Sequence, residues 1–316
     1  MDNVKKVPQR DGYGLGLLEL CEKRPDVMVL DADVAASTRT NWVRDKYPDH
    51  FTNVGISEQD LVGTAAGLAL GGLIPFVSTY GVFLSGRAFD QMRTTVCYNN
   101  LKVRFGGAHA GISVGPDGAT HQALEDLALA RVLPRMTVIA PCDSEETRKA
   151  VLAAVDIDGP VYFRFGREAV PVVTDESTPF VLGKARPVRE GTDCAVFACG
   201  AMVYEAMQAA ELLAERGVSL RVIDLHTIKP IDEDAILAAA KECGAIVTAE
   251  EHQIHAGLFG AVSEVVVRNC PVPMEAVAVL DTFGRSGPPE ALMDRYGLNA
   301  AGIAAAVEKV LARKEK

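Results

Sequence analysis

The chain has 316 residues, of which 48% are hydrophobic and 23% charged, a balance typical of a globular protein with apolar material for two cores. Its formal net charge of −10 leaves no surplus of lysine and arginine to neutralise phosphates. This excludes a general nucleic-acid binder and a protein of anionic membrane surfaces. Small phosphorylated substrates remain compatible with the charge, because they need only a few well-placed cations.

The seven cysteines are scattered and include no Cys-X-X-Cys pair. An odd, unpatterned set is typical of reduced thiols, so we expect a cytoplasmic protein without a disulfide framework or a zinc site. Residues 1–10 have no apolar run, which argues against a signal peptide. No stretch approaches the roughly 18 apolar residues of a membrane span, so neither a membrane nor nucleic acid is an expected partner.

Short apolar runs alternate with helical periodicity in the first half of the chain. Near-continuous apolar character suits parallel strands that are buried on both faces. Such strands are expected at residues 27–31, 51–54, 74–79, 103–107, 137–140 and 161–165. Helices are expected between them, at 13–22, 57–70, 83–98, 122–132 and 144–155. The alternation predicts βαβ units and a doubly wound sheet.

Residues 168–192 contain three prolines and two glycines without a helical period, which indicates an inter-domain connection. A second α/β series follows. Its strands are expected at 194–198, 219–224, 245–249 and 274–278, and its helices at 202–216, 232–242, 258–268 and 300–313. The sequence therefore predicts two doubly wound α/β domains, at residues 1–170 and 191–316, with a linker at 171–190.

Ligands of open α/β sheets gather at the carboxyl ends of the strands, and four loops there carry polar or aromatic residues. The first, residues 53–60 (NVGISEQD), follows a strand and opens a helix. Ser57 begins a capping-box pattern, and Glu58 lies in the first turn, where a carboxylate complements the helix dipole. These residues alone favour a structural role for Glu58.

The most informative loop is residues 106–121 (GGAHAGISVGPDGATH), which is rich in glycine and carries His109, Asp117 and His121. Long ordered loops in compact domains are usually functional. Histidines offer donors and acceptors near neutral pH. Three such side chains in one loop favour a polar substrate over a purely structural role.

Aromatic residues and an arginine mark the other two loops. Tyr80, Phe83 and Phe89 cluster in YGVFLSGRAFD, where they form either ordinary helix packing or a stacking wall for a flat heteroaromatic ring. Arg164 lies within FRFGR, in an apolar strand. It either pairs with a buried carboxylate or reaches a ligand phosphate.

The motifs of these four loops, taken together, resemble those of a known family. GISEQD, YGVFLSGRAFDQ, HAGISVGPDGATHQ and FRFGR occur in the order found in the pyrimidine-binding domain of transketolases, which this chain resembles. Residues beyond about 190 resemble the transketolase C-terminal domain. The histidine-containing loop HAGISVGPDGATHQ is a specific signal of this resemblance, whereas GISEQD is shared more widely among thiamine-diphosphate enzymes. The resemblance implies a pyrimidine-binding thiamine-diphosphate domain followed by a smaller transketolase C-terminal domain.

A full-length transketolase has a preceding domain that binds the diphosphate and its metal through a GDG…N signature, which this sequence lacks. The resemblance therefore implies the C-terminal subunit of a split transketolase, active only with an N-terminal partner subunit. That partner would carry the ligands of Mg²⁺ or Ca²⁺, with none on this chain. We expect an α2β2 heterotetramer with two sites at the subunit interface.

The resemblance also implies roles toward the thiamine ring. Glu58 matches the glutamate that hydrogen-bonds the aminopyrimidine and favours the imino tautomer, whose nitrogen takes the proton from the thiazolium carbon. The expected cofactor-binding aromatic residues are Tyr80, Phe83 and Phe89. Gly86 stands at a position where the family has an aromatic residue, so we expect the pyrimidine wall to be completed differently.

For the substrate, His109 and His121 match catalytic histidines near the reacting carbons, and Asp117 matches a residue that binds a substrate hydroxyl. Arg164 matches an arginine that holds the sugar phosphate. Further phosphate contacts are expected from Arg10 and Ser37.

The leading functional prediction is transfer of a two-carbon ketol unit from a ketose phosphate, such as xylulose 5-phosphate, to an aldose phosphate, such as ribose 5-phosphate. Deoxyxylulose-phosphate synthase shares the DGxTH element and is one alternative. The β-subunit of a 2-oxo acid dehydrogenase is another, although that family lacks the DGATHQ loop. A non-catalytic scaffold subunit is a third, which the intact set of polar loop residues disfavours.

Overall fold

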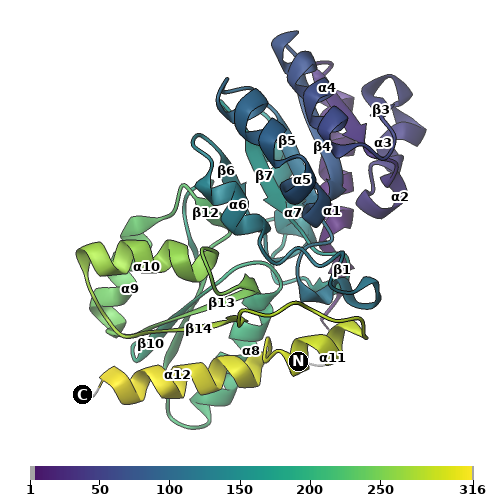
Figure 1. Cartoon of the computed structure of the whole chain (residues 1–316). Helices are drawn as coiled ribbons and strands as arrows, with labels where there is room; N and C mark the ends of the chain where they lie inside the picture. Colours follow the sequence, from purple (N-terminus) through teal and green to yellow (C-terminus); the bar gives the residue numbers. More distant parts are fainter. Residues whose placement is uncertain (1–3, 315–316) are drawn as a thin grey trace.

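Residues 4–314, the part of the chain that the computed structural model describes, form two α/β domains, each built on a mostly parallel sheet (Figure 1). Strands that are apolar on both faces must be covered by helices on both sides, which is the arrangement seen. The prediction of two α/β domains is confirmed. Within these residues, no helix combines the length and apolar character needed to cross a membrane.

The first sheet has the strand order β12-β6-β7-β5-β4-β2-β3. Its parallel strands are β2 (Val27–Asp31), β3 (Phe51–Asn53), β4 (Ile74–Tyr80), β5 (Arg104–Ala108), β6 (Thr137–Ile139) and β7 (Val161–Arg164). The edge strand β12 (Thr227–Lys229) comes from the second half of the chain and pairs antiparallel with β6. The two halves of the chain are therefore joined at this edge.

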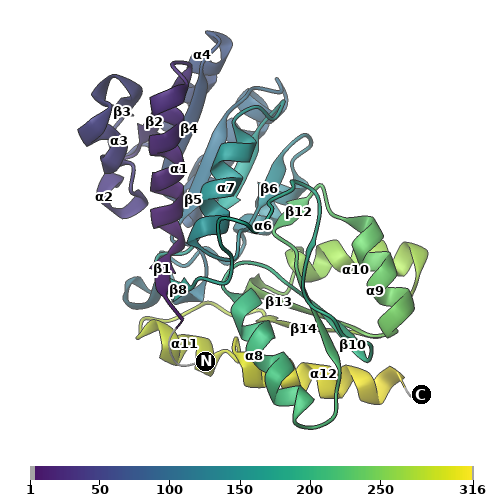
Figure 2. The same cartoon turned by 180° about the vertical axis from the view of Figure 1, so that it is seen from behind.

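Helices cover both faces of this sheet (Figures 1 and 2). One face carries α1 (Gln9–Lys23) and α7 (Ser144–Ala154), and the other carries α4 (Glu58–Leu70), α5 (Gly81–Arg87) and α6 (Asp126–Val132). Shorter helical segments are α2 (Ala35–Thr38), α3 (Asn41–Lys46) and 3-10 turns at Pro48–His50 and Ile112–Asp117.

The single helix expected at residues 83–98 is interrupted. It ends as α5 at Arg87 and resumes as a π-helical segment at Gln91–Cys97. The hydroxyl of Thr94 donates to the backbone carbonyl of Asp90 at 2.6 Å. The Asp90 carbonyl therefore has a side-chain donor where the π-helical segment begins.

The second sheet has the order β14-β13-β10-β11-β9. Its strands are β9 (Arg186–Arg189), β10 (Cys194–Ala198), β11 (Leu220–Asp224), β13 (Ile246–Gln253) and β14 (Met274–Val279), all parallel except β9. Its helices are α8 (Met202–Ala214), α9 (Glu233–Cys243), α10 (Leu258–Asn269), α11 (Pro289–Arg295) and α12 (Ala300–Lys314). Strand β9 falls within the segment expected to be a linker, and its Pro187 is tolerated because β9 is an edge strand.

Apolar packing is continuous across the two domains. One buried cluster contains Leu133 and Val138 of the first domain together with Ile228 and Ala261 of the second. An antiparallel ribbon of β1 (Lys6–Pro8) and β8 (Ala169–Pro171) lies at the same junction (Figure 2). The shared core fixes the position of the second domain behind the loops of the first.

Candidate active site

Four neighbouring strands of the first sheet, β2, β4, β5 and β7, bring polar side chains to one edge, where ligands of such sheets bind. Tyr80 ends β4 and lies opposite Ala108 of β5, so His109 begins beside it. Ser37 follows β2, and Arg167 follows β7. Residues far apart in the sequence therefore meet at the carboxyl ends of these strands.

Two histidines and two aromatic rings form one cluster at this edge. The Tyr80 ring stacks on His109 with centroids 4.2 Å apart, and on Phe83 at 5.9 Å. His121 meets Tyr80 and Phe83 edge-on, at 5.8 and 5.2 Å. The loop residues His109 and His121 are thus brought together with Tyr80 and Phe83, as an arrangement for one substrate requires.

His109 is held in an unusual state. Its side chain is 1% exposed, its φ is +55°, and among residues 4–314 its Nδ1 has no hydrogen-bond partner. Burial, reinforced by the charges of Arg10 and Arg167, lowers the pKa of His109 to about 3. The imidazole is therefore neutral at physiological pH. A buried polar atom without a partner costs about 1–3 kcal/mol, which a bound ligand would recover.

Three arginines surround His109 and act on its pKa: Arg10, Arg39 and Arg167. Arg10 donates to the backbone carbonyl of Ser37 at 3.0 Å, and the Tyr80 hydroxyl bonds the Ser37 hydroxyl at 3.2 Å. No ion pair holds Arg10 within residues 4–314, so its guanidinium charge is available for an anion.

The other two arginines are paired at the mouth of the site. Arg39 meets Asp11 at 2.6 Å, and Arg167 meets Asp117 at 3.2 Å. Asp117 therefore lies beside a cation rather than beside the histidine rings.

Glu58 is buried at the start of α4, with 2% of the residue exposed. Its carboxylate pairs with Arg87 at 2.8 Å, and the Arg87 guanidinium lies 4.8 Å from the centroid of the Phe83 ring. Arg87 therefore connects the buried Glu58 carboxylate to the face of the Phe83 ring. Phe89 instead packs against the hydrophobic core, which supports the helix-packing interpretation for that residue.

Arg164 does not belong to this site. It is 6% exposed, its Nε pairs with Asp126 at 3.1 Å, and its Nη2 donates to the carbonyls of Ala123 and Glu251 at 3.2 and 2.6 Å. The structure thus corrects the expected phosphate contact: Arg164 has the buried-carboxylate partner that was its alternative interpretation. The reason is its place inside β7 rather than after it.

Sequence reasoning missed Arg167, although FRFGR contains it. The signal was available, because Arg167 follows the carboxyl end of a strand and Arg164 lies within the strand. Arg39 and Arg87 gave no such signal, since nothing in their local sequence shows that they approach His109 and Glu58.

Comparisons with known proteins cover nearly the whole chain. Residues 5–173 match the family described as transketolase, pyrimidine binding domain, and residues 183–303 match transketolase, C-terminal domain. The chain is 40% identical to the 6-deoxy-6-sulfo-D-fructose transketolase subunit of Clostridium sp. (strain MSTE9), covering 96% of this chain and 95% of that protein. It is 39% identical to an apulose-4-phosphate transketolase subunit of Phocaeicola vulgatus, covering 91% and 92%.

A solved structure described as a split gene transketolase, inactive beta4 tetramer, has a similar fold. The TM-score is 0.92 and the sequences are 44% identical, covering 98% of this chain and 99% of that one. The similarity therefore extends through both domains and through the junction between them.

Proposed function

Since this chain belongs to the transketolase family, we propose that it is the C-terminal subunit of a split transketolase that transfers a two-carbon ketol unit from a ketose phosphate, such as xylulose 5-phosphate, to an aldose phosphate, such as ribose 5-phosphate. One observation carries the proposal: His109 is buried and neutral near Arg10, and within residues 4–314 neither the His109 Nδ1 nor the Arg10 charge has a partner. This combination suits a polar substrate that ends in an anion.

The family's cofactor is thiamine diphosphate, which when bound supplies the nucleophilic carbon and the electron sink for carbon–carbon cleavage. The residues present fit its aminopyrimidine ring, because a buried carboxylate, Glu58, and an aromatic face, Phe83, are held on either side of one arginine, Arg87. We assign Glu58 to the ring nitrogen and Phe83 to the ring face, with Tyr80 stacked behind Phe83.

This chain's other residues would bind and orient the sugars. Arg10, Ser37 and Arg167 hold the terminal anion, and Asp117 accepts a hydrogen bond from a substrate hydroxyl. His109 and His121 exchange protons with substrate oxygens near the reacting carbons. His109 is neutral in the free protein, because burial and the arginines keep it deprotonated, so its ring can accept a proton from a substrate oxygen and return it.

The proposed partner is an N-terminal subunit that holds the diphosphate and a divalent metal, Mg²⁺ or Ca²⁺, in an α2β2 assembly. Two findings support this proposal. The relatives are named as transketolase subunits, and the similar structure is described as an inactive tetramer of β chains. One relative is named for a sulfosugar and another for a sugar phosphate, so the anion of the substrate is either a sulfonate or a phosphate.

The test is co-expression of this chain with a partner that carries a GDG…N signature, followed by a coupled assay. We expect product from xylulose 5-phosphate plus ribose 5-phosphate only when both subunits and thiamine diphosphate are present. The same assay is run with sulfofructose or with pyruvate as the donor. Activity with sulfofructose would identify a sulfosugar transketolase, and activity with pyruvate a deoxyxylulose-phosphate synthase. Robust turnover by this chain alone, or activity with pyruvate only, would overturn the proposal.

A further inference from the structure

The second domain supports the loop that carries the substrate histidines. We call residues 109–121 the substrate loop. Helix α11 packs against its 3-10 turn, and the side-chain amide of Gln122, at the end of the loop, donates at 3.0 Å to the carbonyl of Arg285 in the second domain. The loop is therefore held from behind by a domain that contributes no residue to the cluster around His109.

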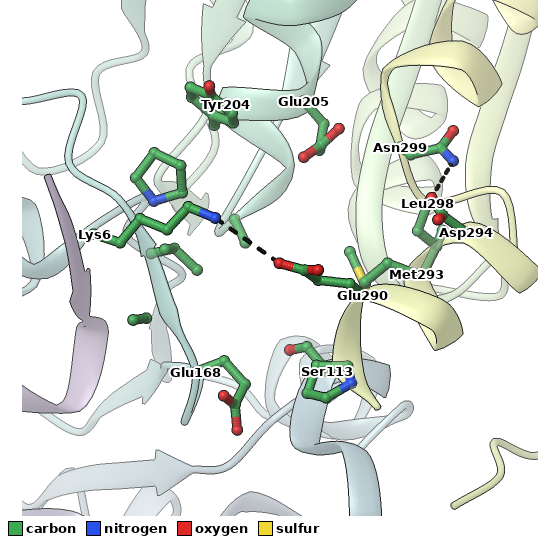
Figure 3. Close-up of a pocket in the computed structure, with 15 residues that line it drawn as sticks. Lys6, Ser113, Glu168, Tyr204, Glu205, Glu290, Met293, Asp294, Leu298 and Asn299 are labelled. Carbon is green, nitrogen blue, oxygen red and sulfur yellow. Dashed lines mark hydrogen bonds and ion pairs between the residues drawn. The ribbon is translucent and has the colours of Figure 1, made fainter. Parts of the chain in front are cut away.

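One carboxylate of that domain reaches into the loop itself. Glu251, on β13, accepts a hydrogen bond from the backbone N–H of Ser113. Ser113 also borders a pocket of about 350 Å³ whose other walls include residues of α8 and α11 (Figure 3). Ser113 stands between the fully buried Ile112 and Val114, so packing holds the turn and the hydrogen bond from Glu251 fixes the backbone N–H of Ser113 within it.

Close approach of the loop to the second domain requires glycine at two points. Gly111 has φ +90°, and a methyl group there would overlap the Glu251 carboxyl. Gly118 has φ +74°, and a methyl group there would overlap the Ser286 hydroxyl. Both positions combine a left-handed backbone with contact across the domain boundary, so the loop conformation and the domain contact are linked.

Glu251 also holds the first domain through its main chain. It is 5% exposed, and its carbonyl accepts from Arg164 at 2.6 Å, while Arg164 pairs with Asp126. One residue of the second domain thus contacts both β7 and the substrate loop of the first. The hydrogen bond from Arg164 fixes the backbone of Glu251 relative to the first sheet. The Glu251 carboxylate in turn binds the backbone N–H of Ser113.

We propose that Glu251 is a positioning residue, through which the C-terminal domain sets the substrate loop and hence the place of His109 and Asp117. Ser113 lies four residues after His109 in the same loop, so we expect a shift of the Ser113 backbone to displace the histidine from its stacking contact with Tyr80. The proposal rests on the proposed function for its kinetic consequence only. The order of the loop itself can be measured without substrate or cofactor.

The neighbouring residue supplies a matched control. Glu250 is also buried, at 0% exposed, and its carboxylate also accepts backbone N–H groups, from Leu258 at 2.6 Å and Phe259 at 2.8 Å. These belong to the start of α10, within the second domain. Glu250→Ala therefore removes the same chemistry without touching the substrate loop.

The experiment measures hydrogen–deuterium exchange of residues 109–121 in the full chain, and donor KM and kcat in the assembled complex. For Glu251→Ala we expect exchange in the loop to rise and donor KM to increase about tenfold, with a smaller change in kcat. Glu251→Gln, which keeps an acceptor for Ser113, should restore both. Glu250→Ala should raise exchange in α10 and leave the loop and the KM unchanged.

Unchanged loop exchange in Glu251→Ala, or the same loop exchange in Glu250→Ala, would overturn the proposal. If Glu251→Ala does not fold, Glu251→Asp takes its place, because it keeps the charge and withdraws the carboxylate from Ser113. A wild-type complex without ketol transfer would refute the proposed function, whereas the exchange comparison would still decide the role of Glu251.

Discussion

At the residue scale, the chain places each polar group by its position relative to a strand end. The histidines of the glycine-rich loop could be selected from sequence, because a long loop with three polar side chains is rarely structural. Arg164 and Arg167 could not be separated by composition, since both belong to FRFGR. Only their places, inside β7 and after it, decide which one pairs with Asp126 and which one faces Asp117.

Substitution of Arg167 should affect substrate binding, whereas substitution of Arg164 should affect stability. Arg167→Met is expected to raise the KM for phosphorylated donors by about 10- to 100-fold with little change in stability, because a partly exposed anion contact is lost. Arg164→Met is expected to lower the free energy of unfolding by about 3–5 kcal/mol, because the buried Asp126 loses its only ion-pair partner within residues 4–314. Steady-state kinetics and urea unfolding of both variants check this, and equal KM effects would contradict it.

Acid should destabilise the wild-type protein through His109. Its pKa is lowered to about 3 in the folded chain, mainly by burial, and returns to its usual range on unfolding. Between pH 6.5 and 3 the unfolded chain therefore binds the proton and the folded chain does not, so stability falls as pH falls, by about 1.4 kcal/mol per pH unit. His109→Asn should lack this component. Urea unfolding of both proteins at pH 6.5 and 4.5 measures the difference, and parallel curves would disagree with this assignment.

At the element scale, the sequence predicted the buried parallel strands and most helices, because their apolar periodicity is continuous. Short strands such as β9 and β12 were not predicted, because three or four residues are too few to show a periodic pattern. Their pairing also depends on strands far away in the sequence. The start of α7 at Ser144 was predicted, and Asp143 shows why: it caps the helix by accepting from the N–H of Glu146 at 2.9 Å.

Asp143 also joins α7 to the chain beyond β8, by accepting from the N–H groups of Val173 and Thr174, each at 2.7 Å. The Thr174 hydroxyl donates to Asp143 as well, at 2.8 Å. Asp143→Ala is therefore expected to cost about 3 kcal/mol, more than an ordinary cap, because four donors lose their acceptor. Asp234→Ala, in the exposed first turn of α9, should change stability by less than about 0.5 kcal/mol. Urea unfolding distinguishes the two, and a similar small effect for both would count against the capping role.

At the scale of the whole molecule, buried charges join the two domains. Glu146 of α7 and Asp224 of β11 both face Arg186 of β9, at 3.8 and 2.8 Å. The ligand atoms of Cys142, Glu146 and Asp224 lie within 4.8 Å of one another, but Arg186 already supplies the positive charge there. None of this could be predicted from sequence, because the three charged residues come from elements that meet only when both domains have folded.

Burial, and then the Asp224 carboxylate, raises the pKa of Glu146 well above its usual range. The stabilising contribution is full below the unfolded pKa, near 4.5, and is lost as pH rises toward the folded pKa. Glu146→Gln mimics the protonated side chain, so it should gain stability relative to wild type between pH 5 and 8, by at least about 1 kcal/mol. The free energy of unfolding of wild type and Glu146→Gln, measured at pH 5 and at pH 8, tests this. A stability difference independent of pH would contradict the raised pKa of Glu146.

The central claim is that Glu58 of this chain activates a thiamine ring whose diphosphate a partner subunit holds. Deuterium exchange at the thiazolium carbon of thiamine diphosphate, in the complex of both subunits, tests it most directly. We expect rapid exchange with wild type, a fall of about 10²- to 10⁴-fold with Glu58→Ala, and no change with Asp60→Ala, an exposed carboxylate of the same helical turn. Exchange that stays at the wild-type rate in Glu58→Ala would contradict the account.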